Sequence, residues 1–133
     1  MIIALFVGIV LIGWGILCFS KYQKWNTRKK RCTKLVHARV IEVLEKKPVR
    51  GSDMLYKPIF LVEDHNIRID SAYYSNLLHL TPNTYIDLLV DTDNYNNFIY
   101  AEKSLNRGIM ADIVCCCLPI IFLVAILIMI YNQ

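Results

Sequence analysis

Three carboxylates near the end of the chain have the spacing of calcium ligands. Counted from Asp91, the side chains of Asp91, Asp93 and Glu102 occupy positions 1, 3 and 12 of an EF-hand loop. Tyr95 stands where the fifth-position oxygen ligand belongs, and Asn96 replaces the glycine of the turn. We therefore predict a solvated β-turn, in which Asp and Asn side chains bond the local backbone, rather than a metal site.

The histidines and cysteines give no ligand set for a transition metal. His37, His65 and His79 are scattered, whereas a zinc site needs about four ligands at suitable spacing. The run Cys115-Cys116-Cys117 lies in an apolar segment that is expected to be helical. Neighbouring side chains on a helix point about 100° apart, so these thiols cannot all face one ion. We predict no metal and no cofactor.

A hydroxyl nucleophile is the remaining catalytic possibility. Ser71, Ser75 and His79 lie close together in the sequence, and Ser75 and His79 are four residues apart. No helical pattern aligns them, and no glycine-rich loop is present to hold an oxyanion. We predict that the chain is not an enzyme and name no catalytic residue.

Basic residues gather in one segment, residues 21–34, which contains no acidic residue. Each Lys or Arg near an anionic leaflet contributes about 1 kcal/mol to membrane attraction. Nucleic-acid binding is the competing interpretation, but no basic surface interleaved with aromatic residues continues beyond the run. We predict contact with the anionic inner leaflet of a lipid bilayer, and no nucleic acid, for these residues: Lys21, Lys24, Arg28, Lys29, Lys30, Arg31 and Lys34.

Two apolar segments enclose the rest of the chain. No charged residue occurs in residues 1–19 or in residues 113–133, and about 20 apolar residues cross the hydrocarbon layer as a helix. We predict transmembrane helices over residues 1–20 and 108–131. A cleaved signal peptide is the alternative for the first, but it lacks a basic beginning and a cleavage site of small residues, so we expect a retained anchor.

The basic residues also predict the orientation, because Lys and Arg next to a span resist translocation. The run 21–34 follows the first span, and Lys103 and Arg107 precede the second. We expect a multi-pass protein of the cell membrane, with both termini outside and the central domain in the cytoplasm. The central domain contains no cysteine, which suits a reducing compartment.

Each predicted span has local features with structural consequences. Ala4 and Gly8 have small-xxx-small spacing, which favours packing against the second span or against a partner. Asp112 is expected in the first turn of the second helix, where the helix dipole favours a carboxylate. Pro119 is expected to kink that helix and to free a carbonyl one turn earlier. Cys32, beside the membrane, is an acylation candidate.

The central segment, residues 35–104, shows the composition of short β-strands. Its apolar runs are rich in β-branched residues and are separated by turn residues, and the alternation slips at Val40-Ile41, which predicts a bulge. The predicted strands cover residues 36–45, 59–63, 67–70, 85–90 and 98–102. We predict an α+β membrane protein in which two transmembrane helices flank a small five-stranded barrel or curled sheet.

The central segment is also rich in tyrosine. Aromatic residues in so small a β fold are expected mainly in its core and rim. Those that remain exposed would form a face for a partner protein. We name Tyr73, Tyr74 and Tyr95 as this possible partner face.

The order of these motifs resembles a known family. An apolar span is followed by HARVIEV, YKPIFLVED, IRIDSAYYS and TPNTYIDLLVDTDN, and then by a second span. Residues 34–104 resemble the domain of unknown function 3592 family, with residues 56–60 and 83–94 matching its two best-marked elements. Asn83 replaces a glycine of the family motif, and Thr92 and Tyr95 replace its prolines. The resemblance implies a membrane-tethered β domain and supplies no activity.

Two functional hypotheses remain open at the level of sequence. The first is a non-catalytic, membrane-anchored interaction module whose cytoplasmic β domain or spans bind another protein. The second is a small membrane immunity protein that neutralises a toxin, which the size and the topology permit.

Overall fold

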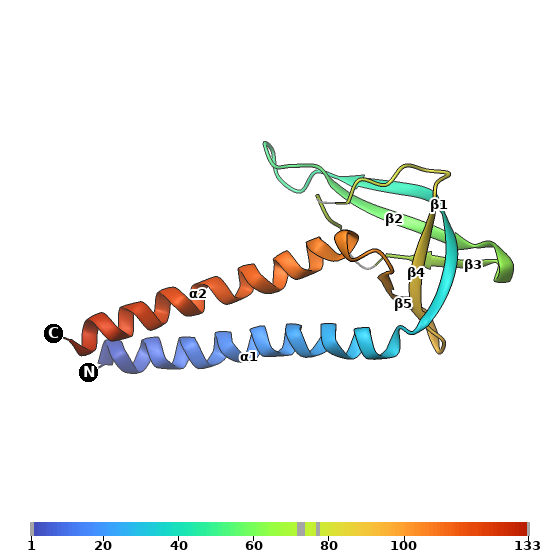
Figure 1. Ribbon diagram of the computed structural model, residues 1–133. Coiled ribbons are helices and arrows are strands. Elements are labelled where there is room, and N and C mark those ends of the chain that lie inside the picture. Colours follow the sequence, from blue (N-terminus) through green and yellow to red (C-terminus); the bar gives the residue numbers. More distant parts are fainter. Residues whose placement is uncertain (1, 72–73, 77, 133) are drawn as a thin grey trace. The chain divides into compact units, whose positions relative to one another are not determined.

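The protein consists of two compact units joined by continuous chain. The computed structural model describes residues 2–71, 74–76 and 78–132. The two ends of the chain form a helical unit, and Thr27–Gly108 forms a β unit. The predicted class is confirmed at this level, because two apolar helices flank a curled antiparallel sheet of five strands (Figure 1).

Helix α1 spans Ile2–Arg31 and is longer than the sequence pattern predicted. The helix continues beyond the predicted span of residues 1–20 and through the basic run for three further turns. The continuation contains no Pro or Gly, and Lys, Arg and Gln are good helix formers. Cations in the last turn also interact favourably with the negative end of the helix dipole. The basic segment of residues 21–34, which we expected to be a juxtamembrane linker, is therefore largely helical.

Helix α2 spans Arg107–Tyr131 and follows a short 3-10 helix, η2, over Lys103–Asn106. Because α2 begins at Arg107, Asp112 lies in its second turn, and the prediction of a first-turn carboxylate is wrong. Pro119 lies inside the helix, as expected from the sequence.

Both helices are long and apolar enough to cross a membrane by their length and composition. Within the described chain, the single buried residue of α1 is Cys18, and α2 has none. The helices run antiparallel, with the N and C ends of the chain at the same end of the pair (Figure 1). A side-chain carbon placed on Gly8 would meet no atom within 4 Å, so the small-residue spacing at Ala4 and Gly8 produces no tight backbone contact.

The β unit contains one antiparallel sheet in the order β3-β2-β1-β4-β5. All five predicted strands are present, with ends that differ by up to four residues. Their bounds are as follows: β1 Lys34–Lys46, β2 Leu55–Val62, β3 Ile67–Asp70, β4 Tyr85–Asp91 and β5 Asn94–Tyr100.

Strand β1 organises the sheet, because it pairs along its first half with β4 and along its second half with β2. His37 lies opposite Asp87 in the β4 ladder, and Val43 lies opposite Pro58 in the β2 ladder. The register with β2 shifts between Val40 and Glu42, which confirms the predicted bulge. A bulge increases local twist and bends the strand. Figure 1 shows β1 as a long curved strand around which the sheet curls.

Asparagines make the tight connections that this curvature requires. Asn66 ends the short 3-10 helix η1 (Glu63–His65) between β2 and β3 with φ of 49°. Asn83 has φ of 65° in the turn before β4, where its backbone N–H donates to the carbonyl of Val40 at 2.7 Å. Asn tolerates this left-handed region better than most residues.

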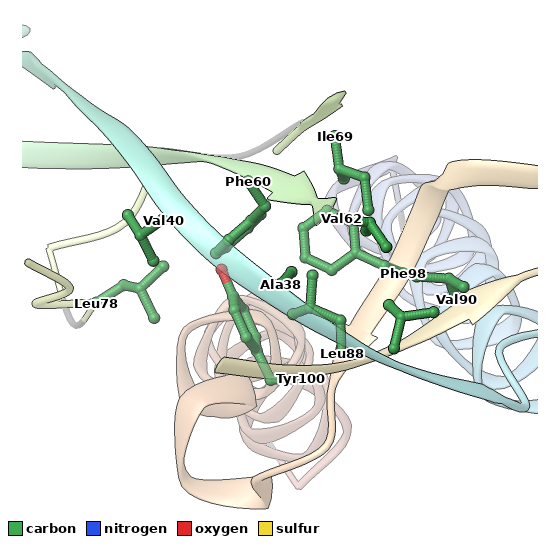
Figure 2. Packing of buried hydrophobic residues seen from close by; sticks show 11 residues of the cluster. Ala38, Val40, Phe60, Val62, Ile69, Leu78, Leu88, Val90, Phe98 and Tyr100 are labelled. Carbon is green, nitrogen blue, oxygen red and sulfur yellow. The ribbon is translucent and has the colours of Figure 1, made fainter. Parts of the chain in front are cut away.

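The core of the β unit lies on the inner side of the curled sheet. Figure 2 shows side chains from every strand converging there, joined by Leu78 from the segment before β4. Phe60 is 0% exposed, and its ring meets the edges of Phe98 and Tyr100 at centroid distances of 5.5 and 6.1 Å. Edge-to-face contacts of this kind add to the free energy gained by burial.

Side chains, rather than further paired strands, hydrogen-bond to part of the two edge strands, β3 and β5. The backbone N–H of Asp70 at the end of β3 donates to Asn96 Oδ1 on β5 at 3.3 Å, so the two edge strands approach each other. Asn106 in η2 is buried, and its amide accepts from the N–H of Tyr100 at 3.1 Å and donates to the carbonyl of Tyr100 at 2.8 Å. These contacts cover strand edges that would otherwise be open to pairing.

Candidate functional site

The predicted membrane-surface residues lie mainly on the exposed continuation of α1. Spacings of three and four residues bring four of their side chains to one side of the helix, namely those of Lys21, Lys24, Arg28 and Arg31. Lys29 and Lys30 point to other sides. Lys34 belongs to β1, where its Nζ donates to the hydroxyl of Tyr95 at 2.6 Å. The basic side of α1 is thus a coherent surface, and Lys34 is not part of it.

One residue of this basic side has an acidic partner within the helical unit. Lys21 Nζ lies 2.9 Å from Asp112 Oδ2 on α2. Both side chains are about half exposed, so in water the pair would contribute at most about 1 kcal/mol. The pair places Asp112, in the second turn of α2, beside Lys21, the first basic residue of α1.

One turn before this ion pair, α1 contacts the backbone of α2 at the carbonyl of Cys116. Trp14 Nε1 donates to this oxygen at 2.6 Å, and Cys18 Sγ donates to it at 2.9 Å. Pro119 lacks an N–H, and a proline inside a helix disturbs the carbonyls of the preceding turn. The carbonyl that Pro119 leaves without its helical partner is that of Cys115, so the donors of α1 bond the next carbonyl along α2.

A second group of polar side chains lies on the outer face of the sheet, across β1 and β4. Alternation along the two strands sends Val36, Ala38 and Leu88 into the core and their neighbours outward. The ladder then places outward-facing residues opposite one another in three successive pairs. We call these the outer-face pairs: Leu35 with Leu89, His37 with Asp87, and Arg39 with Tyr85.

Contacts within the outer-face pairs hold their side chains in place. His37 Nδ1 lies 2.5 Å from Asp87 Oδ1, and the His37 ring stacks on Tyr85 with centroids 5.2 Å apart and planes at 5°. Arg39 Nε lies 2.9 Å from Glu63 Oε1 as an ion pair, although this N–H is not aimed along a hydrogen bond. The Tyr85 hydroxyl donates to the same carboxylate at 3.3 Å. Glu63 thus joins η1 to both strands.

This network resembles part of a catalytic apparatus only in its histidine-carboxylate pair. Asp87 orients the imidazole of His37, as a general base requires. Both side chains are more than half exposed, however, so water screens the interaction between them. Among the described residues, no group of three or more His, Cys, Asp or Glu side chains has the geometry of a metal site. The His37–Asp87 pair is therefore a solvent-screened contact on the outer face of the sheet.

Two tyrosines of the predicted partner face, Tyr74 and Tyr95, lie apart from each other. Tyr73 lies outside the described residues. Tyr74 is exposed, with Lys46 Nζ 5.7 Å from its ring centroid, whereas Tyr95 has Lys34 Nζ at 5.2 Å. Lys34 and Lys46 are the first and last residues of β1, so Tyr74 and Tyr95 lie at opposite ends of that strand.

The other sequence motifs have local structural roles. Asp91 ends β4, and its Oδ1 accepts from the N–H of Asp93 at 3.1 Å, while Asn94 Oδ1 accepts from the N–H of Asn96 at 3.0 Å. The prediction of a turn with side chains bonded to local backbone is thereby confirmed.

The three histidines lie on separate elements. His37 is on β1 and His65 is in η1, whereas His79 packs against the ring of Tyr56 with centroids 5.3 Å apart. Ser75, considered above as a nucleophile, pairs with Tyr56 through backbone hydrogen bonds of 2.9 and 3.0 Å. Ser71 is buried beyond the end of β3.

Cys32 is poorly placed for acylation. Its side chain is 2% exposed, and its Sγ donates to the carbonyl oxygen of Asn97 at 3.2 Å. Burial raises the pKa of the Cys32 thiol above its ordinary value, so the nucleophilic thiolate is disfavoured. The thiol acts as a structural link between the end of α1 and β5.

Sequence reasoning did not identify the contacts between α1 and α2 or the outer-face pairs. A signal for the first was present, because Trp14, Cys18 and Lys21 follow one another at intervals of four and three residues, and Asp112 and Cys116 are four residues apart. The outer-face pairs depend on the register of β1 with β4, which the sequence alone does not give.

Comparisons with family models, with curated proteins and with solved structures find no match to this chain. The resemblance to the domain of unknown function 3592 family therefore stays a prediction.

Proposed function

We propose that the chain is an integral protein of the cell membrane that crosses the bilayer twice and acts as a non-catalytic protein-interaction module. The observation that carries the membrane assignment is the exposure of apolar side chains along both helices. Their large apolar residues are exposed on the side away from the partner helix as well as at the ends. Exposure of such a surface to water is unfavourable in free energy, whereas contact with the hydrocarbon of a bilayer is not.

The basic side of α1 supports the proposed orientation. Its cations begin immediately after the apolar part of the helix, where they would meet the anionic headgroups of the inner leaflet. With α1 and α2 antiparallel, one such orientation leaves both termini outside and the β unit in the cytoplasm. The Lys21–Asp112 ion pair would then lie at the inner boundary of the hydrocarbon, where a charged pair is tolerated.

The outer-face pairs are the surface that we assign to a partner protein. Leu35 is 62% exposed and Tyr85 is 53% exposed, so the face offers apolar area. Arg39 and the His37–Asp87 pair add charge and hydrogen-bonding groups around it. Tyr and Arg are enriched among the residues that dominate binding energy in protein interfaces.

Preorganisation favours this face further. The stacked His37 and Tyr85 rings and the two bonds to Glu63 restrict side chains that would otherwise lose rotamer freedom on binding. A surface whose side chains are already ordered binds with a smaller entropic cost. The proposed partner face therefore replaces the three tyrosines suggested by composition, of which Tyr74 and Tyr95 lie far apart.

Site-specific crosslinking tests this assignment in living cells. A photoreactive amino acid in place of Tyr85 is expected to give a discrete adduct of higher mass after irradiation. The same residue in place of Tyr74, which is exposed at the other end of β1, is the matched control and should give none. The adduct at position 85 should weaken strongly in an Arg39→Ala background.

The interaction proposal fails if position 85 gives no adduct, or if positions 85 and 74 give the same adducts. Membrane insertion is measured separately in these samples by washing the membranes with carbonate at high pH. Release of the protein by carbonate would contradict insertion, whatever the crosslinks show.

A further inference from the structure

Two thiols of the helical unit are in direct contact. The Sγ atoms of Cys18 on α1 and Cys116 on α2 lie 3.0 Å apart, and a disulfide bond is about 2.05 Å long. Closing the bond requires a movement of about 1 Å. We propose that Cys18 and Cys116 are an oxidation site, and that a hydroperoxide converts them into a disulfide that joins the two helices covalently.

Contacts on both sides of the thiols keep the helices in register. Trp14 bonds the Cys116 carbonyl at 2.6 Å one turn before Cys18, and Lys21 pairs with Asp112 at 2.9 Å one turn after it. The Cys18 thiol also donates to the same carbonyl at 2.9 Å. The two sulfurs are therefore held together by neighbouring interactions and do not meet only by chance.

Burial distinguishes the roles of the two cysteines. Cys18 is 6% exposed, whereas Cys116 is partly exposed and its neighbours Cys115 and Cys117 are exposed. An oxidant approaching the pair reaches Cys116 first. Cys18 is then the resolving thiol, already placed at the sulfur that it must attack.

The reaction balances with the hydroperoxide as the sole oxidant. The sulfur of Cys116 attacks one oxygen of the peroxide, so the O–O bond breaks, and the products are a sulfenic acid and an alcohol or water. The sulfur of Cys18 then attacks the sulfenic sulfur, forming the S–S bond and releasing water. In total, two thiols are oxidised by two electrons and one hydroperoxide is reduced.

The position of the pair suits a neutral oxidant. Cys18 lies three residues before Lys21, which is about 4.5 Å along a helix axis. In the proposed membrane orientation, the thiols lie just inside the hydrocarbon boundary, within reach of hydrogen peroxide from water and of hydroperoxides formed on lipid chains. The thiolate is the reacting form and charge is disfavoured in hydrocarbon, so we expect a slow reaction.

Counting free thiols tests the proposal on the full chain in native membranes. After treatment with hydrogen peroxide or cumene hydroperoxide, the protein is denatured and labelled with a maleimide that adds a fixed mass per thiol. The chain has five cysteines, and we expect the labelled number to fall from five to three and to return to five after reduction. Comparing the two oxidants distinguishes an aqueous from an apolar source.

Variants identify the pair. Cys115→Ser is the matched control, one residue away on the same helix, and should fall from four labelled thiols to two. Cys116→Ser should stay at four, whereas Cys18→Ser should lose at most one thiol, the Cys116 thiol that is left as a sulfenic acid without its resolving partner. Loss of two thiols in either of these variants would overturn the assignment, as would a disulfide-linked dimer in the wild-type protein.

Copper phenanthroline tests the distance between the two thiols separately from the identity of the oxidant, because it oxidises close thiols regardless of their natural oxidant. Closure by copper phenanthroline without closure by either hydroperoxide would overturn the proposed oxidant. Failure with all three reagents would overturn the thiol contact itself. Neither result bears on the crosslinks from position 85, so the proposed function is judged separately.

Discussion

At the scale of single residues, Phe60 is the side chain on which the core of the β unit depends most directly. It comes from the central part of β2, is fully buried, and contacts the rings of Phe98 and Tyr100 on β5. Strands β2 and β5 are not neighbours in the sheet, so this contact joins opposite sides of the curled structure. A small domain of this kind has little other core with which to replace it.

We expect Phe60→Ala to lower the free energy of unfolding of the β unit by about 3–5 kcal/mol, because the deletion leaves a cavity. A urea titration of the full chain in mild detergent, followed by tyrosine circular dichroism, measures the effect. Val49→Ala, at an exposed position in the β1–β2 loop, is the control and should change stability by less than about 0.5 kcal/mol. Equal effects of the two substitutions would contradict the described core.

Tyr100 gives the β unit a dependence on alkaline pH. Burial raises the pKa of its phenol above the ordinary value, so the folded state favours the neutral form. The resulting contribution to stability is complete below the unfolded-state pKa of about 10 and is lost as the pH rises above that value.

The urea midpoint of the wild-type protein should therefore fall more between pH 8 and pH 11 than that of Tyr100→Phe. Other titrating groups affect both proteins alike, so the difference between the two pH dependences isolates the phenol. Parallel curves would show that Tyr100 ionises as freely in the folded protein as in the unfolded one.

At the scale of elements, the sequence predicted strands better than it predicted the ends of helices. Apolar runs between turn residues identified all five strands, and the slip in alternation at Val40-Ile41 identified the bulge that bends β1. Hydropathy limited the predicted first span to residues 1–20, because charged residues mark the border of a span. Backbone hydrogen bonding does not stop where hydropathy changes, so α1 continues to Arg31.

The candidate site was less predictable for a related reason. The seven basic residues were found from composition, but four of them share one side of α1 only because that segment is helical. The outer-face pairs require the long-range register that sets His37 against Asp87, and periodicity within one strand cannot supply it. Tyrosine content alone could not show that Tyr74 and Tyr95 lie at opposite ends of β1.

Asn106 caps the end of strand β5 by bonding the backbone of Tyr100. Its amide group makes both hydrogen bonds that a neighbouring strand would make with Tyr100. We expect Asn106→Ala to destabilise the β unit by about 1–3 kcal/mol, because it leaves buried backbone groups without partners. Asn106→Asp keeps the acceptor but loses the donor, so this variant should also show a measurable loss of stability. Asn132→Ala, at the far end of the chain, is the control for the urea titration.

At the scale of the whole molecule, one chain carries three separate surfaces. In the proposed function, the exposed apolar side chains of the helices contact a bilayer, the cations of α1 contact anionic headgroups, and the outer-face pairs of the β unit contact a partner. The proposed thiol pair adds an oxidation site within the helical unit. The cationic surface and the outer-face pairs serve the proposed function only if the β unit lies on the cytoplasmic side.

Cysteine labelling in intact cells measures this sidedness most directly. In a background whose five natural cysteines are replaced by alanine, Arg50→Cys marks the exposed β1–β2 loop and Asn132→Cys marks the end of α2. With a maleimide that cannot cross membranes, the account predicts labelling of position 132 in intact cells and of position 50 only after permeabilisation. Labelling of position 50 in intact cells would contradict it.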